Sequence, residues 1–179
     1  DNAGQVILVR CRNITIMNSE LTNTDVGIEL FESDNCLISN NNISSDYWHG
    51  IFLWYSNNNS ISNNDISLNN RFGIDLWYSN NNSISNNDIS NNGLGIVLEY
   101  SNNNMICLNN FVNNTYNACS SYLTNVWNST EPITYTYRGS EFTNYMGNYW
   151  DDYTGSDTNG DGIGETPYII DENNIDNYP

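Results

Sequence analysis

The strongest chemical motif of the chain is an acidic, glycine-rich loop near its C-terminal end, DTNGDGIGE over residues 157–165. Side-chain oxygens at its first, third and fifth positions, a glycine at the sixth and a backbone carbonyl at the seventh are typical of calcium-binding loops. Carboxylates held this close together without a cation would oppose folding. We therefore expect one Ca²⁺ ion, with these ligands: Asp157, Asn159, Asp161, the Ile163 carbonyl and Glu165.

The loop departs from a full EF-hand loop at its twelfth position, where Tyr168 stands in place of the bidentate glutamate. Glu165, or Asp151 or Asp152 from outside the loop, would have to complete the metal shell. The alternative interpretation is an ordinary turn rich in aspartate and glycine.

A second set of chemical groups recurs on what we expect to be an outward strand face. Phe31, Trp54 and Trp77 occupy equivalent positions of successive repeats and could stack on sugar rings. Asp75 and Glu99 fall on adjacent repeats, two positions apart, or roughly 8 Å by strand geometry. That separation suits an inverting pair of carboxylates in a glycan-cleaving enzyme. The alternative is that the aromatic residues cover the sheet and the acids keep it soluble.

A sequence repeat must position these groups. NNSISNNDISLNNRFGIDLWYS over 58–79 recurs as NNSISNNDISNNGLGIVLEYS over 81–101, so that Ile84 repeats Ile61 and Gly95 repeats Gly73. Within each repeat Ile and Leu lie two residues apart, and the segments between hold single Ile residues among turn-forming Asn and Ser. Each repeat is therefore three short strands and three turns, and the fold is all-β, a parallel β-helix.

Four apolar columns predict the core of this solenoid. They begin at Val6, Leu8, Ile16 and Leu21 and continue once per repeat. We also expect an inward ladder of stacked amides, each donating to the next copy and accepting from the previous one. Its predicted members are Asn13, Asn35, Asn58, Asn81, Asn103 and Asn125. The alternative is that these Asn residues only fill surface turns.

The repeats predict a β-helix of five to six rungs over residues 1–128 and an aromatic cap over 129–179, which holds a short hairpin and the calcium-type loop. The first rung, from Gly4 to Val9, has no predicted cover. An uncovered strand edge is a template for association. We expect it to pair with a copy of the chain or with a neighbouring surface protein.

Composition narrows the setting of the protein. The formal net charge is -17 and all four basic residues are Arg, which disfavours nucleic acid and anionic membranes as partners. No segment is apolar enough to span a membrane, and the polar, acidic composition favours an extracellular protein.

The repeat stacks no two cysteines directly, although a disulfide bridge between Cys11 and Cys36 remains possible, and Cys107 and Cys119 lie in other columns. If the Asn ladder points inward, the plausible acceptors for N-glycosylation are the sequon residues Asn42, Asn113 and Asn128.

The rungs, followed by NYWDDYTGSDTNGDGIGETPY over residues 148–168, resemble the NosD-type β-helix repeat proteins of methanogenic archaea. That group includes surface-layer-related and disaggregatase-related proteins, so the resemblance implies an exported, right-handed parallel β-helix without implying one activity. Some members are copper-delivery proteins, but we expect no copper here. The chain has one histidine, no paired cysteines, and methionines in no shared column.

From the sequence we therefore expect an extracellular, calcium-stabilised β-solenoid on an archaeal cell surface, with a structural or binding role that includes self-assembly or glycan binding. The alternative is a polysaccharide-cleaving enzyme, a hydrolase or lyase, that uses Asp75 and Glu99.

Overall fold

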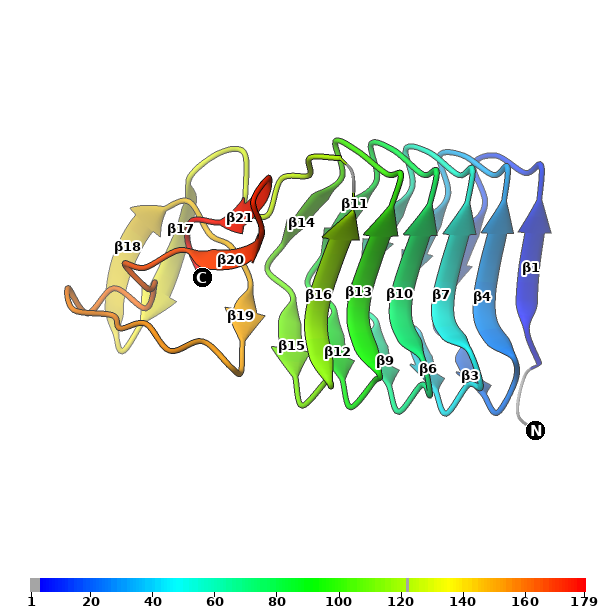
Figure 1. Cartoon of the computed structure of the whole chain (residues 1–179), viewed down its shortest axis with the longest axis horizontal. Helices are drawn as coiled ribbons and strands as arrows, with labels where there is room; N and C mark the ends of the chain where they lie inside the picture. Colours follow the sequence, from blue (N-terminus) through cyan, green and yellow to red (C-terminus); the bar gives the residue numbers. More distant parts are fainter. Residues whose placement is uncertain (1–3, 122) are drawn as a thin grey trace.

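The computed structural model describes residues 4–121 and 123–179, and these residues form strands, turns and loops without a helix. The chain winds into a parallel β-helix whose successive rungs add strands to three parallel sheets (Figure 1). The sheet with the longest strands, here called the long sheet, contains β1 (Val6–Val9), β4 (Val26–Phe31), β7 (His49–Trp54), β10 (Phe72–Trp77), β13 (Leu94–Glu99) and β16 (Tyr116–Ser121).

Short strands form the other two parallel sheets. The second sheet contains β2 (Thr15–Met17), β5 (Leu37–Ser39), β8 (Ser60–Ser62), β11 (Ser83–Ser85) and β14 (Met105–Cys107). The third contains β3 (Glu20–Thr22), β6 (Asn42–Ser44), β9 (Asp65–Ser67), β12 (Asp88–Ser90), β15 (Asn110–Val112) and β19 (Tyr149–Trp150). The fold is thus the predicted solenoid, in which each sequence repeat forms one rung.

The core lies inside the three sheets and contains the predicted apolar columns. In the long sheet the parallel register pairs Ile28 with Ile51, Ile51 with Ile74 and Ile74 with Ile96, and all four side chains are fully buried. Leu, Ile and Phe columns beside them are equally buried. Burying one such side chain contributes roughly 1.5–3 kcal/mol, so stability accumulates rung by rung.

The turns between strands depend on residues in the left-handed backbone region. Most of these residues are asparagines, with φ between 54° and 60°, including Asn58, Asn81 and Asn103. Asn tolerates this conformation because its short side chain bonds locally, whereas most L-residues are strained there by roughly 1–2 kcal/mol. The abundance of Asn therefore has a backbone cause as well as a side-chain one.

This placement corrects the predicted Asn ladder by one residue. Asn13, Asn35, Asn58, Asn81 and Asn103 are exposed turn residues with positive φ, and only Asn125 among the six predicted members is inward. The buried ladder runs instead through Asn59, Asn82, Asn104, Asn125 and Asn174. In each pair of adjacent Asn residues, such as Asn58 and Asn59, one side chain points outward and the other inward. The first residue of the pair has the left-handed backbone conformation and is exposed, and the second is buried. N-glycosylation sequons also begin at Asn13, Asn58 and Asn81, and the predicted inward ladder argued against them. Because these three residues are exposed, that argument no longer holds.

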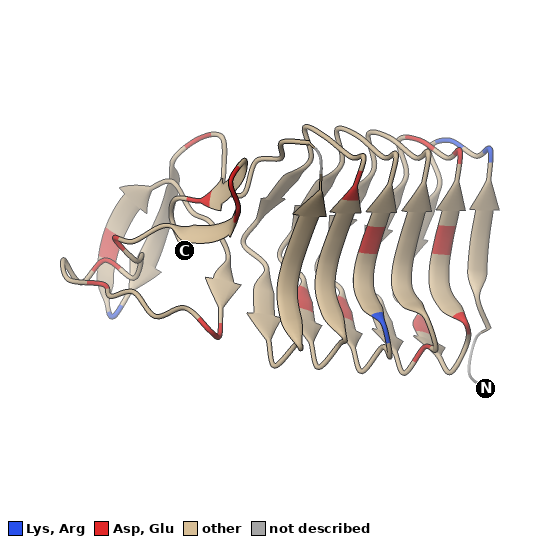
Figure 2. Ribbon diagram, in the orientation of Figure 1, with Lys and Arg blue, Asp and Glu red and all other residues tan. Residues whose placement is uncertain are grey.

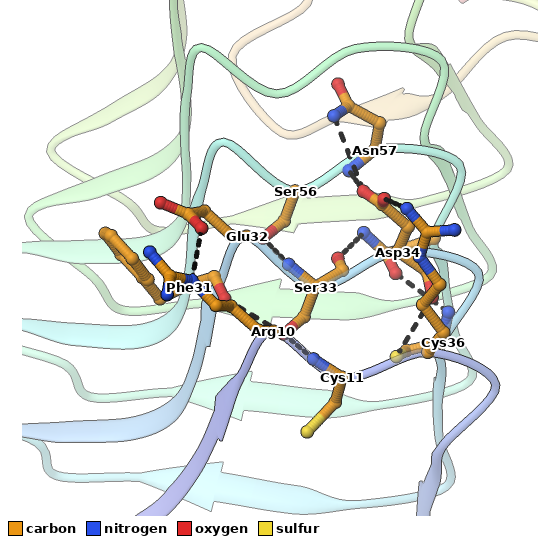
Figure 3. Close-up of polar contacts among 11 residues, drawn as sticks. Arg10, Cys11, Phe31, Glu32, Ser33, Asp34, Cys36, Ser56 and Asn57 are labelled. Atoms are coloured by element: carbon orange, nitrogen blue, oxygen red, sulfur yellow. Dashed lines mark hydrogen bonds and ion pairs between the residues drawn. The ribbon is translucent and has the colours of Figure 1, made fainter.

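Buried polar ladders in fact line all the corners of the β-helix. A second Asn ladder runs through Asn41, Asn64, Asn87, Asn109 and Asn148. A third contains Asp46, Asn69, Asn92 and Asn114. A serine ladder contains Ser33, Ser56, Ser79 and Ser101, and Figure 3 shows its first members with Cys11.

Each amide ladder has one direction. The amide nitrogen of Asn64 donates to the oxygen of Asn87 on the next rung at 2.9 Å and to the Ile38 carbonyl of the previous rung at 3.0 Å. The backbone N–H of Asn64 also donates to the Asn87 oxygen. Buried polar groups are costly unless they are satisfied in this way. A ladder of this kind must end on an acceptor.

The C-terminal segment supplies those acceptors. Asn148 donates its backbone and amide N–H groups to Asp176, which is fully buried, and Asn174 donates to Asp171. Gly147 must be glycine, because an added Cβ would overlap the Asp176 carboxylate. On the first rung the ladder positions hold Cys11, Ser19 and Thr24 rather than amides.

Two antiparallel pairs and an aromatic stack complete the C-terminal segment, which covers the last rung (Figure 1). The predicted hairpin is present as β17 (Ile133–Tyr137) and β18 (Ser140–Asn144), and a second pair comprises β20 (Tyr168–Asp171) and β21 (Asn174–Asp176). Trp150 stacks between Phe111, at 4.5 Å, and Tyr168, at 4.2 Å. β19 extends the third sheet by pairing with β15, so this segment continues the solenoid rather than only resting on it.

Candidate functional site

The outward side of β4, β7, β10 and β13 carries the predicted glycan-binding residues and the predicted pair of acids. Strand alternation turns Ile and Leu inward and the residues between them outward. We call this surface the aromatic face and define it by Phe31, His49, Phe52, Trp54, Phe72, Asp75, Trp77, Val97 and Glu99.

His49 is the first residue of β7 and lies on the aromatic face. Its imidazole stacks between the rings of Phe52, at 4.8 Å, and Phe72, at 5.1 Å. Its Nε2 atom lies 3.3 Å from Oδ2 of Asp75 on the next strand. Sequence reasoning noted His49 only as a poor copper ligand. The register could have placed it, since His49 and Phe72 occupy the same position of successive repeats.

The predicted glycan-binding residues do come together. Phe31 and Trp54 meet edge to face at 5.2 Å, and Trp54 and Trp77 lie 6.3 Å apart. Trp77 remains 38% exposed, so part of its ring is open to solvent. Its indole N–H donates to the Glu99 carboxylate on the next strand. The two tryptophans therefore differ, because only the Trp77 indole N–H is bonded.

Asp75 and Glu99 lie on neighbouring strands of this face, at diagonal positions in the register. Asp75 is only 7% exposed and faces His49, and Glu99 accepts the Trp77 N–H. A general acid and a general base must both reach the bond that is cleaved and, in an inverting enzyme, a water between them. Buried and engaged carboxylates suit ligand positioning better than such chemistry.

Buried polar atoms without partners concentrate on the aromatic face. Among the described residues, five side-chain nitrogen or oxygen atoms are buried and unbonded. Three of the five belong to this face: Nδ1 of His49, Nε1 of Trp54 and Oδ1 of Asp75. An unsatisfied buried polar group costs about 1–3 kcal/mol, so these three atoms lower the stability of the fold, and their burial keeps them out of contact with solvent.

A tyrosine stack borders the aromatic face and was missed by sequence reasoning. Tyr55, Tyr78 and Tyr100 stack in parallel with centroids 4.9 and 4.8 Å apart. All three adopt left-handed φ values of 50° to 51°, a strained conformation for a bulky residue. Because each ring lies against the next, the middle ring offers its edge, not its face, to a ligand. The signal was visible as a Tyr in every copy of the WYS or EYS triplet.

The residues of the calcium-type loop turn their oxygens toward the backbone of the loop itself. The Asp157 carboxylate accepts the N–H groups of Gly160 at 2.6 Å, Asp161 at 3.0 Å and Gly162 at 2.9 Å. Asp161 in turn accepts the N–H of Ile163 at 2.9 Å. Among the described residues, no group of three or more His, Cys, Asp or Glu side chains is arranged to hold a metal ion.

Glu165 closes this loop from its other end. Its carboxylate accepts the Thr158 N–H at 2.9 Å and the Asn159 N–H at 3.1 Å. These hydrogen bonds, first of all the one from Thr158, hold the pKa of Glu165 below its ordinary value. The loop is therefore ordered by its own carboxylates.

The hairpin β17–β18 supports the loop through two tyrosines. The Tyr137 ring lies against Gly162, where an added Cβ would meet it at 2.9 Å and where φ is +93°. The Tyr135 hydroxyl is buried without a partner. Burial raises the pKa of Tyr135, and the negative charges of Asp161 and Asp157 raise it further. The loop and the hairpin are thereby coupled.

A cavity of about 450 Å³ lies beside this loop, between the last rung and the C-terminal segment. Tyr137, Tyr149, Tyr153, Asp151 and Asp157 line part of it. Its acids already have partners, since Asp157 bonds the loop backbone and Asp151 accepts the Asn117 amide at 3.0 Å, which is the main cause of its lowered pKa. The cavity therefore offers aromatic walls with few unused polar groups.

The fold defines a class of protein, the parallel β-solenoid whose corners carry buried polar ladders. A sequence profile of the family described as "Periplasmic copper-binding protein (NosD)" matches residues 1–155 of the chain. The protein therefore belongs to the NosD family. A search of curated proteins found no match. The described residues include no helix that could cross a membrane.

The side chains of this chain do not fit the copper ion named in the family description. Copper in proteins is held by clustered histidine, cysteine or methionine side chains. The single histidine is stacked between two phenylalanines, and Cys11, Cys36, Cys107 and Cys119 are free thiols in different columns. The Cys11 and Cys36 thiols instead bond backbone carbonyls of their own rungs, so a bridge between them is not formed.

Proposed function

We propose that this protein is an extracellular β-solenoid that binds polysaccharide along its aromatic face. The observation that carries the proposal is the meeting of Phe31, Trp54 and Trp77 on one partly exposed surface, beside the Glu99 carboxylate. Aromatic rings with a few polar groups are the usual composition of a ligand site. A rigid sheet holds them in line, so successive rungs present a track rather than a pocket.

Several features support a location outside the cytoplasm. The family description names the periplasm, and a net charge of -17 suits a surface protein that stays soluble. Acidic residues are spread over both the β-helix and the C-terminal segment, whereas Lys and Arg occur at few places (Figure 2). The resemblance to repeat proteins of methanogenic archaea extends the proposal to an archaeal cell surface, with neighbouring surface proteins as partners.

Calcium and self-association are further parts of this proposal. Oxygen atoms of Asp157, Asn159, Asp161 and Glu165 face one short loop, and a cation there would offset their mutual repulsion. The first rung, with Ile7 and Val9 each more than half exposed, is the surface through which copies of the chain would pair. Sedimentation over a range of concentrations tests this second part, and a monomer at every concentration contradicts it.

The second candidate function is glycan cleavage by Asp75 and Glu99. It is favoured only by their position on the aromatic face. Incubation of the protein with soluble polysaccharides, followed by a reducing-end assay, separates the two functions. Cleavage that is lost in Asp75→Asn or Glu99→Gln would replace the binding proposal with the enzymatic one.

The binding proposal is tested by the double variant Trp54→Ala/Trp77→Ala in native gels that contain soluble polysaccharide. We expect at least a tenfold loss of affinity, about 1.4 kcal/mol, with a far-UV spectrum like that of the parent. The matched control is Tyr47→Ala, which removes an exposed aromatic ring off this face. Equal retardation of the parent and the double variant, or no retardation of the parent on any polysaccharide, contradicts the proposal.

A further inference from the structure

Glu99 is an acid on the aromatic face that has no basic partner in the described part of the chain. Its Oε2 atom accepts the Trp77 indole N–H, whereas no hydrogen bond to its Oε1 atom is formed there. The arginines of the chain are all engaged elsewhere, either by a carboxylate or by an aromatic ring: Arg10, Arg12, Arg71 and Arg138. The negative charge of Glu99 is therefore available to a ligand.

Two aromatic rings lie beside this carboxylate and are open to solvent. Trp77 is directly opposite Glu99 in the register of β10 and β13. The rings of Trp77 and Tyr78 have centroids 6.1 Å apart and planes inclined by 60°. Each of these two side chains is more than a third exposed, and Glu99 is half-buried. A ligand can thus reach both rings and the carboxylate from solvent without entering a cavity.

The chemistry of this group favours a cation. An aromatic ring attracts a positive charge over its face, and a carboxylate accepts a charge-assisted hydrogen bond from an ammonium group. The same face already holds a cation in this way, because the Arg71 guanidinium lies over the Phe72 ring at 5.1 Å. An anionic ligand would be repelled by Glu29 and Glu99 and by a chain of net charge -17.

We propose that Trp77, Tyr78 and Glu99 form a subsite that recognises the ammonium group of an amino sugar within a polysaccharide. This inference rests on the proposed glycan binding and adds the class of glycan. The C–H side of the sugar ring packs on the Trp77 ring, and the ammonium group donates to Glu99 Oε1. A lysine side chain carries the same charge on a flexible stem, whereas a sugar ring holds its charge and its apolar surface in one rigid unit, which lowers the entropic cost of binding.

The test is isothermal titration calorimetry with a soluble chitosan oligomer and with the N-acetylated oligomer of the same length, which lacks the charge. The titrations are run at about pH 5.5, where the amines and Glu99 are charged, and in about 0.15 M salt, which screens distant charges. The parent should bind the chitosan oligomer at least fivefold more tightly. Glu99→Gln keeps an acceptor for the Trp77 N–H and removes the charge, so it should weaken chitosan binding at least threefold and leave binding of the N-acetylated oligomer unchanged.

The matched control is Glu20→Gln, which changes the net charge equally at an exposed position of the third sheet and should leave both affinities unchanged. Equal losses in the two variants would mean attraction by net charge alone and would overturn the subsite. Equal affinity of the parent for the two oligomers, or for chitosan and a lysine oligomer of the same charge, also overturns it.

These results are distinct from failure of the proposed function. A parent protein that another polysaccharide retards in native gels but that does not bind the chitosan oligomer loses only the subsite. Retardation by no polysaccharide contradicts glycan binding itself.

Discussion

Asp46 occupies in its rung the ladder position that Asn69 occupies in the next, and its backbone N–H donates to the Asn69 side-chain oxygen at 3.0 Å. Its Oδ1 accepts the Thr24 N–H as a ladder amide would. Its Oδ2 stands where Asn69 has an amide nitrogen, and it is buried without a partner. Burial raises the pKa of Asp46, and the hydrogen bonds from Thr24 offset this only in part.

The first prediction is that Asp46→Asn stabilises the protein. The amide restores the missing donor, and we expect a gain of about 1–2 kcal/mol near neutral pH. The folded-state pKa is raised, so the folded protein holds more protons than the unfolded chain between the ordinary and the raised value. The free energy of unfolding should therefore fall as pH rises through that window in the parent, and this fall should be smaller in the variant. Urea unfolding across pH 4 to 8 measures both.

The second prediction is that the same substitution at Asp176 has the opposite sign. The Asp176 carboxylate accepts the Asn148 backbone N–H at 2.7 Å, the Trp150 indole N–H at 3.0 Å and the Tyr178 N–H at 3.0 Å. An amide there would point N–H groups at donors, whichever way it is turned. We expect Asp176→Asn to destabilise the protein by roughly 2–3 kcal/mol, measured by urea unfolding at pH 7. An unchanged midpoint would show that Asp176 does not terminate the ladder.

The ladder positions of these two aspartates could not be predicted from the sequence, whereas the rungs of the β-helix could. Ile and Leu at alternate positions, recurring at the same place in every repeat, determine the rungs, because burial dominates the choice of face. The register of the ladder is harder to predict from the sequence. In a pair such as Asn58–Asn59 both residues are asparagine, and only the backbone conformation decides which of them is buried. The sequence also could not predict that the His49 Nδ1 and Trp54 Nε1 atoms lack partners, because residue types alone do not show which hydrogen bonds form between rungs.

A third prediction tests the corrected register. Asn87 lies in a buried ladder and Asn86 is its exposed, left-handed neighbour. Asn87→Ala leaves the backbone N–H and amide of Asn64 without their acceptor, so it should cost roughly 3 kcal/mol. Asn86→Ala loses only the conformational preference of Asn and should cost about 1 kcal/mol. Chemical unfolding of the two variants side by side is the measurement, and equal costs would argue against the ladder.

The fourth prediction concerns the calcium-type loop. A cation bound only by the folded protein adds stability as RT ln(1 + [L]/Kd). The melting temperature of metal-free protein should therefore rise with Ca²⁺ and fall again with chelator, while Mg²⁺ should substitute poorly because it demands a tighter octahedral shell. Asp161→Asn should reduce the rise, and Glu172→Gln, which changes an exposed acid outside the loop, serves as the control. A melting temperature indifferent to calcium would leave the loop as a turn ordered by its own carboxylates.

The directional ladders also bear on how such a chain changes over generations. In the buried amide ladders, interior amides donate to the next rung and accept from the previous one in the same way, with Asp46 as an exception, and the ladder ends carry other residues, such as Ser19 at one and Asp176 at the other. A gene that gains or loses the codons of one repeat would therefore yield a chain with both ends intact. The identity of residues 58–67 and 81–90, which both read NNSISNNDIS, is what a recent duplication would leave. Each such event would lengthen or shorten the solenoid by about 4.8 Å, so the length of its sheets is open to selection one rung at a time.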